Sequence, residues 1–586
     1  MSVLAIAPLT GRNSRYVKYV ALAGSLASLA LLPFVTYGAT SFVWLSMHGV
    51  VLQITSSITP INMMLLSIIL LVAPIILAYS FGYMRAPSEQ RRFYAEMLIF
   101  EAAMLTFSIA GDFITMFIAW EFLSLMSYLL IGFWHKRPKA SRAARKAITI
   151  VLMGDICILA AMVLVWSASG SFAFSLAFAA SAAHSPAIVA AAVLLAIAVM
   201  TKSAQFPFQE WLPDAMEGPT PVSAFLHSTT MVKAGVFVVV LMYPLFHNTG
   251  MLGALFAVSA VTVVLSTMNA MKETQIKRVI AYSTVQELGL MIFAASGGAI
   301  LACIYFFLVQ SFYKALLFFS AGSAMTATGK EDLNEISGMR SNRLVYVTTL
   351  VGVLSLAGFL PFSGFFSNIG LGSSFYRNLI AYAFISTIGL STSFFIFRWL
   401  FLSSKSPSDE LTRIAYLRLP RSMVIAMVMA ASLALLSIPT FFYVTGFIEG
   451  HGSYLAQFIG SKGLGPSSYY DPVIETVMAL AGAAASYYAY SRRKALRSPL
   501  LSGIAHNAGA VNAAYAFFAF LITGMGEGIA AFDSYLSTAF DDIGRLTVLS
   551  GRAIRRASVG SINIYLAIFS IALVVAFSYA YLFGGI

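Results

Sequence analysis

The sequence predicts an all-α, polytopic membrane protein of about 15 transmembrane helices. Hydrophobic residues fill 59% of the 586 positions and charged residues only 10%, a balance that soluble domains do not have. Apolar runs of roughly 20 residues, the length that crosses about 30 Å of hydrocarbon, recur along the chain. The two cysteines, Cys157 and Cys303, both lie in apolar runs, which excludes a disulfide framework and cysteine-ligated iron–sulfur clusters.

The apolar runs define the organisation of the chain. The predicted spans are 16–38, 62–84, 94–110, 113–134, 147–168, 186–206, 221–246, 249–270, 277–297, 300–326, 344–370, 376–402, 422–446, 472–490 and 562–583. They group into N-terminal transmembrane helices (1–93), two five-helix repeats (94–246 and 249–402), C-terminal transmembrane helices (403–490), a lateral segment (491–561) and a terminal helix (562–586). An odd number of helices per repeat places the two repeats in opposite orientation.

Basic residues predict the orientation of these spans. With the N-terminus inside, the inner loops carry 30 of the 36 Lys and Arg residues, and the outer loops carry two. This distribution follows the positive-inside rule and predicts a cytoplasmic N-terminus. The net charge of +13 is therefore a topology signal, and it needs no nucleic acid as partner. The first 19 residues lack the pattern of a cleavable signal peptide.

The lateral segment 491–561 has basic residues at both flanks, which places both of its ends on the inner side. We expect an amphipathic helix, or a chain of helices, that lies along the inner membrane face. Gly524, Gly526 and Gly528 would bend or interrupt it. The alternative is a membrane hairpin formed by residues 508–523 and the turns that follow.

Each five-helix repeat contains a proline in its fourth helix. The first stretch reads QFPFQEW around Pro207, and the second reads FLPFSGFF around Pro361. Proline breaks the helical hydrogen-bond ladder, and carbonyls freed inside a bilayer must be satisfied by protein or water. Paired broken helices in inverted repeats are typical of a transport site.

Ionisable residues within the spans are the candidate site. The first repeat contributes Glu121, Asp155, Lys202, His227 and Lys233, and the second contributes Glu287 and Lys314. A charged side chain facing lipid costs about 2.5–3.5 kcal/mol, so these groups are expected to face an interior polar path. A lysine beside a carboxylate in such a path can hold or release a proton according to neighbouring charge. The alternatives are a static buried salt bridge, a snorkelling Lys202 and a hydrogen-bonded core histidine.

The sequence contains no glycine-rich phosphate loop, no CxxC and no HExxH motif. We therefore expect no metal site, no nucleotide site and no redox centre in this chain.

Four stretches resemble the antiporter-like membrane subunits of respiratory complex I and of multisubunit cation/proton antiporters. They read WEFLSLMSYLLIGFW, KSAQFPFQEWLPDAMEGPTPVSAFLHSTTMVKAGV, KRVIAYSTVQELG and FYKALLFFSAGS. Within this superfamily the chain is most similar to the distal, L-type subunit. The resemblance implies that Glu121 modulates Lys202, that His227 is a connecting histidine, and that Lys314 links two half-channels. It also implies that segment 491–561 straps neighbouring subunits together.

The chain departs from the family pattern at several positions. Phe306 and Gln310 stand where two histidines are usual, and Asn368 stands where the second repeat usually has an outward lysine. Lys233 stands where L-type subunits more often have threonine. The first family helix is shortened, which leaves fifteen spans where sixteen would be expected. The first half-channel is therefore complete, and the second lacks its usual outward group.

The resemblance implies a proton-translocating, non-redox subunit of a quinone oxidoreductase in the plasma membrane of a prokaryote. Its partners would be other membrane subunits and the lipid bilayer, with quinone, flavin and iron–sulfur clusters bound only in partner subunits. The alternatives are a subunit of a cation/proton antiporter or of an inorganic-carbon uptake complex, and a largely structural strap.

Overall fold

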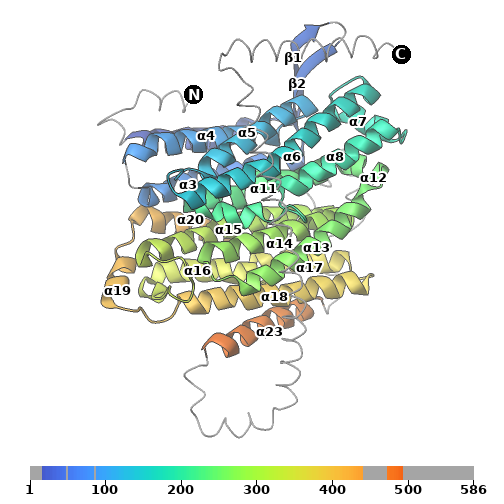
Figure 1. The fold of residues 1–586 in the computed structure, drawn as a ribbon. Helices are drawn as coiled ribbons and strands as arrows, with labels where there is room; N and C mark the ends of the chain where they lie inside the picture. Colours follow the sequence, from blue (N-terminus) through green and yellow to red (C-terminus); the bar gives the residue numbers. More distant parts are fainter. Residues whose placement is uncertain (1–15, 48–49, 85–86, 440–470, 492–586) are drawn as a thin grey trace. The chain divides into compact units, whose positions relative to one another are not determined.

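The computed structural model describes residues 16–47, 50–84, 87–439 and 471–491, and these residues are mainly α-helical (Figure 1). Nine helical segments in this part of the chain are long and apolar enough to cross a membrane, and a bent pair of helices brings the number to ten. The predicted all-α membrane class is therefore confirmed. The count of fifteen spans stays a prediction, because segment 491–561 and the terminal helix lie almost entirely outside the described residues.

The N-terminal part contains a β-hairpin that the sequence analysis did not predict. Helix α2 (Val17–Leu31) and a short 3-10 turn end at Phe34, and strands β1 (Gly38–Met47) and β2 (Val50–Ile58) follow before helix α3 (Pro60–Tyr83). The strands pair antiparallel, with Gly38 opposite Ile58. Backbone hydrogen bonds from β2 to residues 109–111 attach the hairpin to the turn between α4 and α5. The predicted span 16–38 is present as the helical segment Val17–Phe34 and ends a few residues earlier than predicted; the β-branched residues after Gly38 favour a strand.

The first repeat follows the predicted order, with added short helices. Its elements are α4 (Pro87–Ser108), α5 (Phe113–Ile131), α6 (Pro138–Ser169), α7 (Phe174–Ser181), α8 (Pro186–Lys202), α9 (Trp211–Asp214), α10 (Thr220–Ser228) and α11 (Met231–Leu241), then α12 (Tyr243–Asn248). The predicted span 221–246 is present as the apolar helical segment Thr220–Leu241, and its helical structure is interrupted at Thr229 and Thr230.

The second repeat contains the second predicted break. Its elements are α13 (Met251–Lys272), α14 (Ile276–Ser296), α15 (Ile300–Thr328), α16 (Arg343–Leu356), α17 (Ser363–Ser374) and α18 (Leu379–Ser403). The chain leaves helical conformation between Leu356 and Ser363, around Pro361, and Gly358 has a positive φ of 72° there. This conformation suits glycine because a side chain at that φ would be strained.

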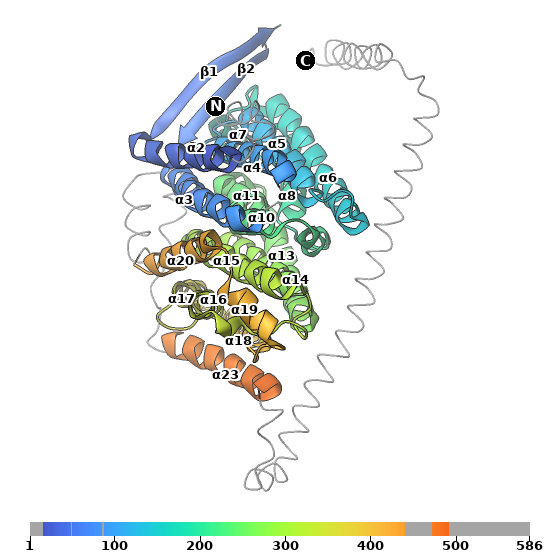
Figure 2. The same ribbon diagram turned by 90° about the vertical axis from the view of Figure 1, so that its left-hand side faces the viewer.

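Three further helices complete the described part of the chain: α19 (Glu410–Leu417), α20 (Arg421–Leu436) and α23 (Asp471–Ser491). Helix α20 packs against α3 and α15, and α23 packs against α18 and α17. The two repeats meet where α10 packs on α15 and α11 packs on α14. Figures 1 and 2 show α14 and α15 between the helices of the first repeat and α16–α18.

Candidate functional site

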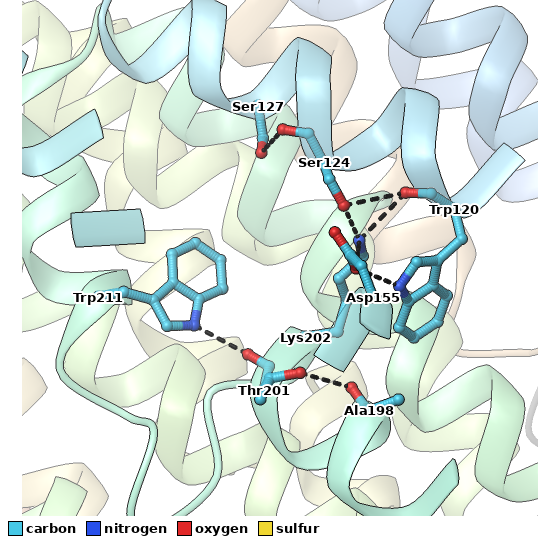
Figure 3. Close-up of polar contacts among 8 residues, drawn as sticks. All are labelled: Trp120, Ser124, Ser127, Asp155, Ala198, Thr201, Lys202 and Trp211. Atoms are coloured by element: carbon cyan, nitrogen blue, oxygen red, sulfur yellow. Dashed lines mark hydrogen bonds and ion pairs between the residues drawn. The ribbon is translucent and has the colours of Figure 1, made fainter. Parts of the chain in front are cut away.

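The first buried ion pair joins the end of α8 to α6. Lys202 is fully buried, and its Nζ lies 3.4 Å from Oδ1 of Asp155. The same Nζ donates hydrogen bonds to the Trp120 carbonyl, at 3.1 Å, and to Ser124 Oγ on α5 (Figure 3). Asp155 Oδ1 also accepts a hydrogen bond of 2.6 Å from Trp120 Nε1. Trp120 therefore contacts both members of the pair.

Glycines allow the neighbouring helices to come close to this pair. A Cβ built on Gly154, next to Asp155, would lie 1.9 Å from Thr201 Oγ1. A Cβ built on Gly235 of α11 would lie 2.3 Å from Ser203 Oγ. Any larger residue at these positions would separate α6 or α11 from the end of α8.

The break after α8 is satisfied by protein groups. The Thr201 carbonyl accepts a hydrogen bond of 2.9 Å from Trp211 Nε1, and Ser203 Oγ donates to the Val232 carbonyl at 2.7 Å. Carbonyls freed at a break inside a membrane need such partners. The bond between Ser203 and Val232 also connects the residue after Lys202 with the residue before Lys233.

Glu121 lies on α5, one residue after Trp120, and is only half-buried. It interacts electrostatically with Asp155 and Lys202, but it forms no hydrogen bond or ion pair with another described residue. The structure thus places Asp155, rather than Glu121, within salt-bridge distance of Lys202.

The second buried ion pair joins α15 to α14. Lys314 Nζ lies 2.6 Å from Glu287 Oε2, with side-chain exposures of 0% and 2%, and it also contacts Ser283 Oγ. Glu287 accepts two further hydrogen bonds, from Tyr313 OH at 2.6 Å and from Gln310 Nε2 at 3.2 Å. Gln310, which departs from the family pattern, thus contributes to holding this carboxylate.

Lys233 lies between the two pairs. It is fully buried on α11, and its Nζ donates to the Phe307 carbonyl, at 2.7 Å, and to Ser311 Oγ on α15. No carboxylate of the described residues lies within salt-bridge distance of it. Ser311 is three residues before Lys314, so the two lysines approach the same turn of α15.

Lys202 and Lys233 are held in the same way. Each Nζ lies over an aromatic ring, 4.4 Å from the centroid of Trp120 and 4.5 Å from that of Phe307. Each contacts the backbone carbonyl of that aromatic residue and the serine four positions later, whose hydroxyl donates to the same carbonyl. We call this arrangement the aromatic–serine cradle.

His227 is fully buried at the end of α10, with its ring centroid 4.8 Å from that of Phe318 on α15. Neither ring nitrogen has a hydrogen-bond partner among the described residues, and the hydroxyls of Ser228 and Thr229 also lack one. Buried polar atoms are nearly always paired with protein or water. Four such atoms at the interruption between α10 and α11 fit a site for ordered water between the repeats.

Two further buried charges, Asp112 and Arg398, have structural roles. Asp112 caps α5, accepting hydrogen bonds from the Thr115 backbone at 2.7 Å and side chain at 2.8 Å. Arg398 on α18 donates to the carbonyls of Ala270, Met271 and Glu273, at the C-terminal end of α13. Cations are favourable at a helix C-terminus, so Arg398 is explained without transport.

Sequence reasoning missed the neutral groups that hold the charged ones, notably Trp120, Ser124 and Tyr313. The sequence contains part of this information, because Trp120 and Ser124 are four residues apart and therefore share a helix face. It also assigned no role to Asp471 and Glu475 on α23, although both are carboxylates within or beside a predicted span.

Together, the described residues form two buried lysine–carboxylate pairs with a third buried lysine and a histidine between them. Lysine and carboxylate can exchange a proton, and each protonation state changes the field at the next group. The arrangement can therefore pass protons, or the energetic effect of protonation, from one repeat to the other.

Comparisons with known proteins agree with this geometry. Residues 110–391 match the family model described as NADH:quinone oxidoreductase/Mrp antiporter, TM, and residues 44–94 match the NADH-Ubiquinone oxidoreductase (complex I), chain 5 N-terminus. A similar curated protein is the chloroplastic NAD(P)H-quinone oxidoreductase subunit 5 of Chaetosphaeridium globosum, 30% identical over 90% of this chain and 86% of that protein.

A second relative and one solved structure are each matched over a smaller share of their own length than subunit 5 is. The NADH-quinone oxidoreductase subunit L of Mycobacterium tuberculosis is 36% identical over 51% of this chain and 48% of that protein. The structure of the Mrp complex from Dietzia sp. DQ12-45-1b superposes with a TM-score of 0.75 at 23% identity, over 99% of this chain and 61% of that chain. At 23% identity, the likeness to the Mrp complex shows a shared fold alone.

The matched transmembrane family and the apolar helices make this chain an integral membrane protein. The long match to subunit 5 extends well beyond the region of the family models. The chain therefore belongs to the family of antiporter-like membrane subunits that NADH:quinone oxidoreductases share with Mrp antiporters.

Proposed function

We propose that this chain is the proton-translocating subunit of a complex I-like quinone oxidoreductase and carries no redox centre of its own. The observation that carries the proposal is the pair of fully buried lysine–carboxylate contacts, Lys202–Asp155 and Lys314–Glu287, joined through Lys233. Such groups are costly inside a membrane, and buried ion pairs add little to stability. Their presence is better explained by proton movement than by folding.

In this proposal the lysines store the transported proton and the carboxylates control its release. When Lys202 is protonated, Asp155 and the Trp120 carbonyl stabilise its charge. A change in charge at Glu121, on the partly exposed side of α5, alters that balance and drives the proton toward Lys233. A proton arriving near Lys233 repels the one on Lys314, because the two lysines share a turn of α15.

A cavity of about 310 Å³ supports water access from one side. It is lined in part by Arg137, Glu217, Lys277 and Glu331. Lys277, in the first turn of α14, donates to the Gly218 carbonyl at 2.8 Å. These residues belong to loops and helix ends that the basic-residue pattern assigns to the inner side. Protons would enter the path from there.

The proposal is tested with Lys314→Ala in the assembled complex, reconstituted in membrane vesicles. Proton uptake, followed with a fluorescent pH-gradient dye, should fall at least about tenfold while the complex keeps its subunit content. Leu316→Ala, a buried residue two positions away, serves as a packing control and should pump. Normal proton uptake with Lys314→Ala would contradict the proposal.

The proposed function also implies the partners and the location of this chain. Neighbouring membrane subunits would be the partners, with segment 491–561 as a strap along them, and quinone, flavin and iron–sulfur clusters would bind in partner subunits. The chain would lie in a prokaryotic plasma membrane with its N-terminus in the cytoplasm.

A second candidate function is transport without redox coupling, as in a cation/proton antiporter or an inorganic-carbon uptake complex. The likeness in fold to the Mrp complex is the observation that supports this second candidate. The two functions differ in their driving reaction. Proton uptake that requires quinone reduction supports the oxidoreductase, whereas sodium- or bicarbonate-driven proton movement without quinone supports the alternative.

A further inference from the structure

Helix α23 carries two buried carboxylates that face α18. Asp471 and Glu475 are 4% and 3% exposed, and four residues of spacing place them on one side of the helix. Tyr382 OH donates to Asp471 Oδ1 at 3.2 Å, and Ser386 Oγ donates to Glu475 Oε1 at 3.1 Å. No Lys or Arg side chain of the described residues forms a salt bridge with Glu475. A buried carboxylate without a cation is costly, and within membrane helices such groups mark transport paths.

Glu475 and Asn368 both lie next to Gly389, which has no side chain to keep them apart. A Cβ built on Gly389 of α18 would lie 3.5 Å from Glu475 Oε2 and 3.9 Å from Asn368 Nδ2. A Cβ built on Gly372 of α17 would lie 3.9 Å from Glu475 Oε1. Gly372 and Gly389 thus let α17 and α18 lie close to Glu475, with Asn368 and Glu475 both next to Gly389.

Asn368 and Gly389 also line a cavity beside the Lys314–Glu287 pair. This cavity of about 20 Å³, room for about one water, is lined in part by Gln286, Glu287, Asn368 and Gly389. Gln286 is fully buried, and its Oε1 has no hydrogen-bond partner among the described residues. An unpaired amide oxygen at a cavity of this size fits a bound water.

The lining of this cavity contains no second carboxylate or lysine. Besides Glu287, the polar side chains that line it are Gln286, Asn368, Thr392 and the Tyr313 phenol, and the first three of these do not ionise. A proton that leaves Glu287 in this direction therefore meets Glu475 as the next carboxylate in the described structure. The basic residues after α23 in the sequence place the opposite end of that helix, with Asp471, on the outer side.

We propose that Glu475 is the outward proton carrier of the second repeat, an inference that rests on the proposed function. A proton moves from the Lys314 ammonium to the Glu287 carboxylate, leaving a neutral amine and a neutral acid. Water in the cavity relays it to Glu475, which becomes the neutral acid while Glu287 regains its charge. Glu475 then releases it past Asp471 and Tyr382 to the outer water, so that one proton is conserved throughout.

The test replaces Glu475 with glutamine, which keeps its size and its acceptor for Ser386 but cannot carry a proton. In the assembled complex in vesicles, Glu475→Gln should lower proton uptake at least about fivefold. Ser386→Ala, which removes the hydrogen bond but keeps the acid, should retain more than half of the parent rate. Loss of uptake in both variants to the same extent would indicate a packing role and overturn the proposal.

Lys314→Ala separates failure of this inference from failure of the proposed function. If Lys314→Ala abolishes uptake while Glu475→Gln pumps normally, the outward carrier is wrong and the proposed function stands. If both pump normally, the proposed function itself is wrong for the second repeat.

A measurement on the unaltered complex covers the case in which Glu475→Gln does not assemble. Dicyclohexylcarbodiimide reacts with protonated carboxyl groups in apolar surroundings, and mass spectrometry locates the adduct. Labelling of Glu475 that rises in parallel with loss of proton uptake supports the carrier role. Normal uptake by complexes in which Glu475 is fully modified overturns it.

Discussion

Replacing Asp155 with asparagine should disable the first half of the path. The substitution keeps the shape of the side chain and an oxygen that can accept from Trp120 Nε1, but it removes the negative charge 3.4 Å from Lys202 Nζ. The protonated form of Lys202 then keeps only neutral acceptors, namely the Trp120 carbonyl, Ser124 Oγ and the new amide oxygen.

The expected size of the effect follows from the distance. Two unit charges 3.4 Å apart interact by about 5 kcal/mol at an effective dielectric constant of about 20. Removing one partner of a buried pair typically costs about 3–5 kcal/mol. The lower figure corresponds to about a 100-fold change in an equilibrium constant, at about 1.36 kcal/mol per factor of ten. A loss of coupled turnover of at least about tenfold is therefore expected.

The assay measures proton uptake and quinone reduction together in vesicles that contain equal amounts of assembled complex. Ser124→Ala is the matched control, because it removes a neutral contact of Lys202 and should lower both rates less than about threefold. Glu121→Gln should also have a smaller effect than Asp155→Asn, because Glu121 is half-buried and its charge is screened. A larger loss with Glu121→Gln than with Asp155→Asn would refute the assignment of Asp155 as the controlling partner.

Three further substitutions test other parts of the structure. Lys233→Ala should lower proton uptake at least about fivefold because it removes the charge between the two pairs, whereas Ser311→Ala should not; equal rates for Lys233→Ala and the parent would contradict this. Gly154→Val should lower the melting temperature of the complex, because its side chain meets Thr201, and overpacking costs about 1–3 kcal/mol; an unchanged melting temperature would speak against the close contact of α6 and α8. Asp112→Ala should cost about 1 kcal/mol through the lost helix cap, seen as a lower melting temperature, with uptake per assembled complex unchanged.

The helical architecture could be predicted from the sequence because apolar length and proline position act locally. The breaks near Pro207 and Pro361 are where the sequence predicts them, since a proline removes a backbone donor and disfavours the helix around it. Proline alone does not decide the outcome, because Pro74 lies inside the continuous helix α3. The hairpin of β1 and β2 could not be predicted in the same way. Its strands are stabilised by pairing with each other and with residues 109–111, and such contacts are set by the tertiary structure.

The candidate site was predictable in its residue types but not in its pairing. Lys202 and Lys314 stand out as single lysines in apolar helices. Which carboxylate meets Lys202 depends on the rotation of α5 and on the close approach of α6 at Gly154, and neither is visible in composition or spacing. Glu475 was overlooked because its significance comes from Gly389 and Asn368, which are distant from it in sequence.

The aromatic–serine cradle has a consequence for how a lysine can change its charge. A serine hydroxyl accepts a hydrogen bond from an ammonium group, and after rotation about its C–O bond it donates one to a neutral amine. Ser124 and Ser311 can therefore satisfy Lys202 and Lys233 in both protonation states without any displacement of the backbone. Hydroxyl rotation takes far less time than helix movement. A change of charge at either lysine therefore leaves its hydrogen bonds satisfied without a displacement of α5 or α15.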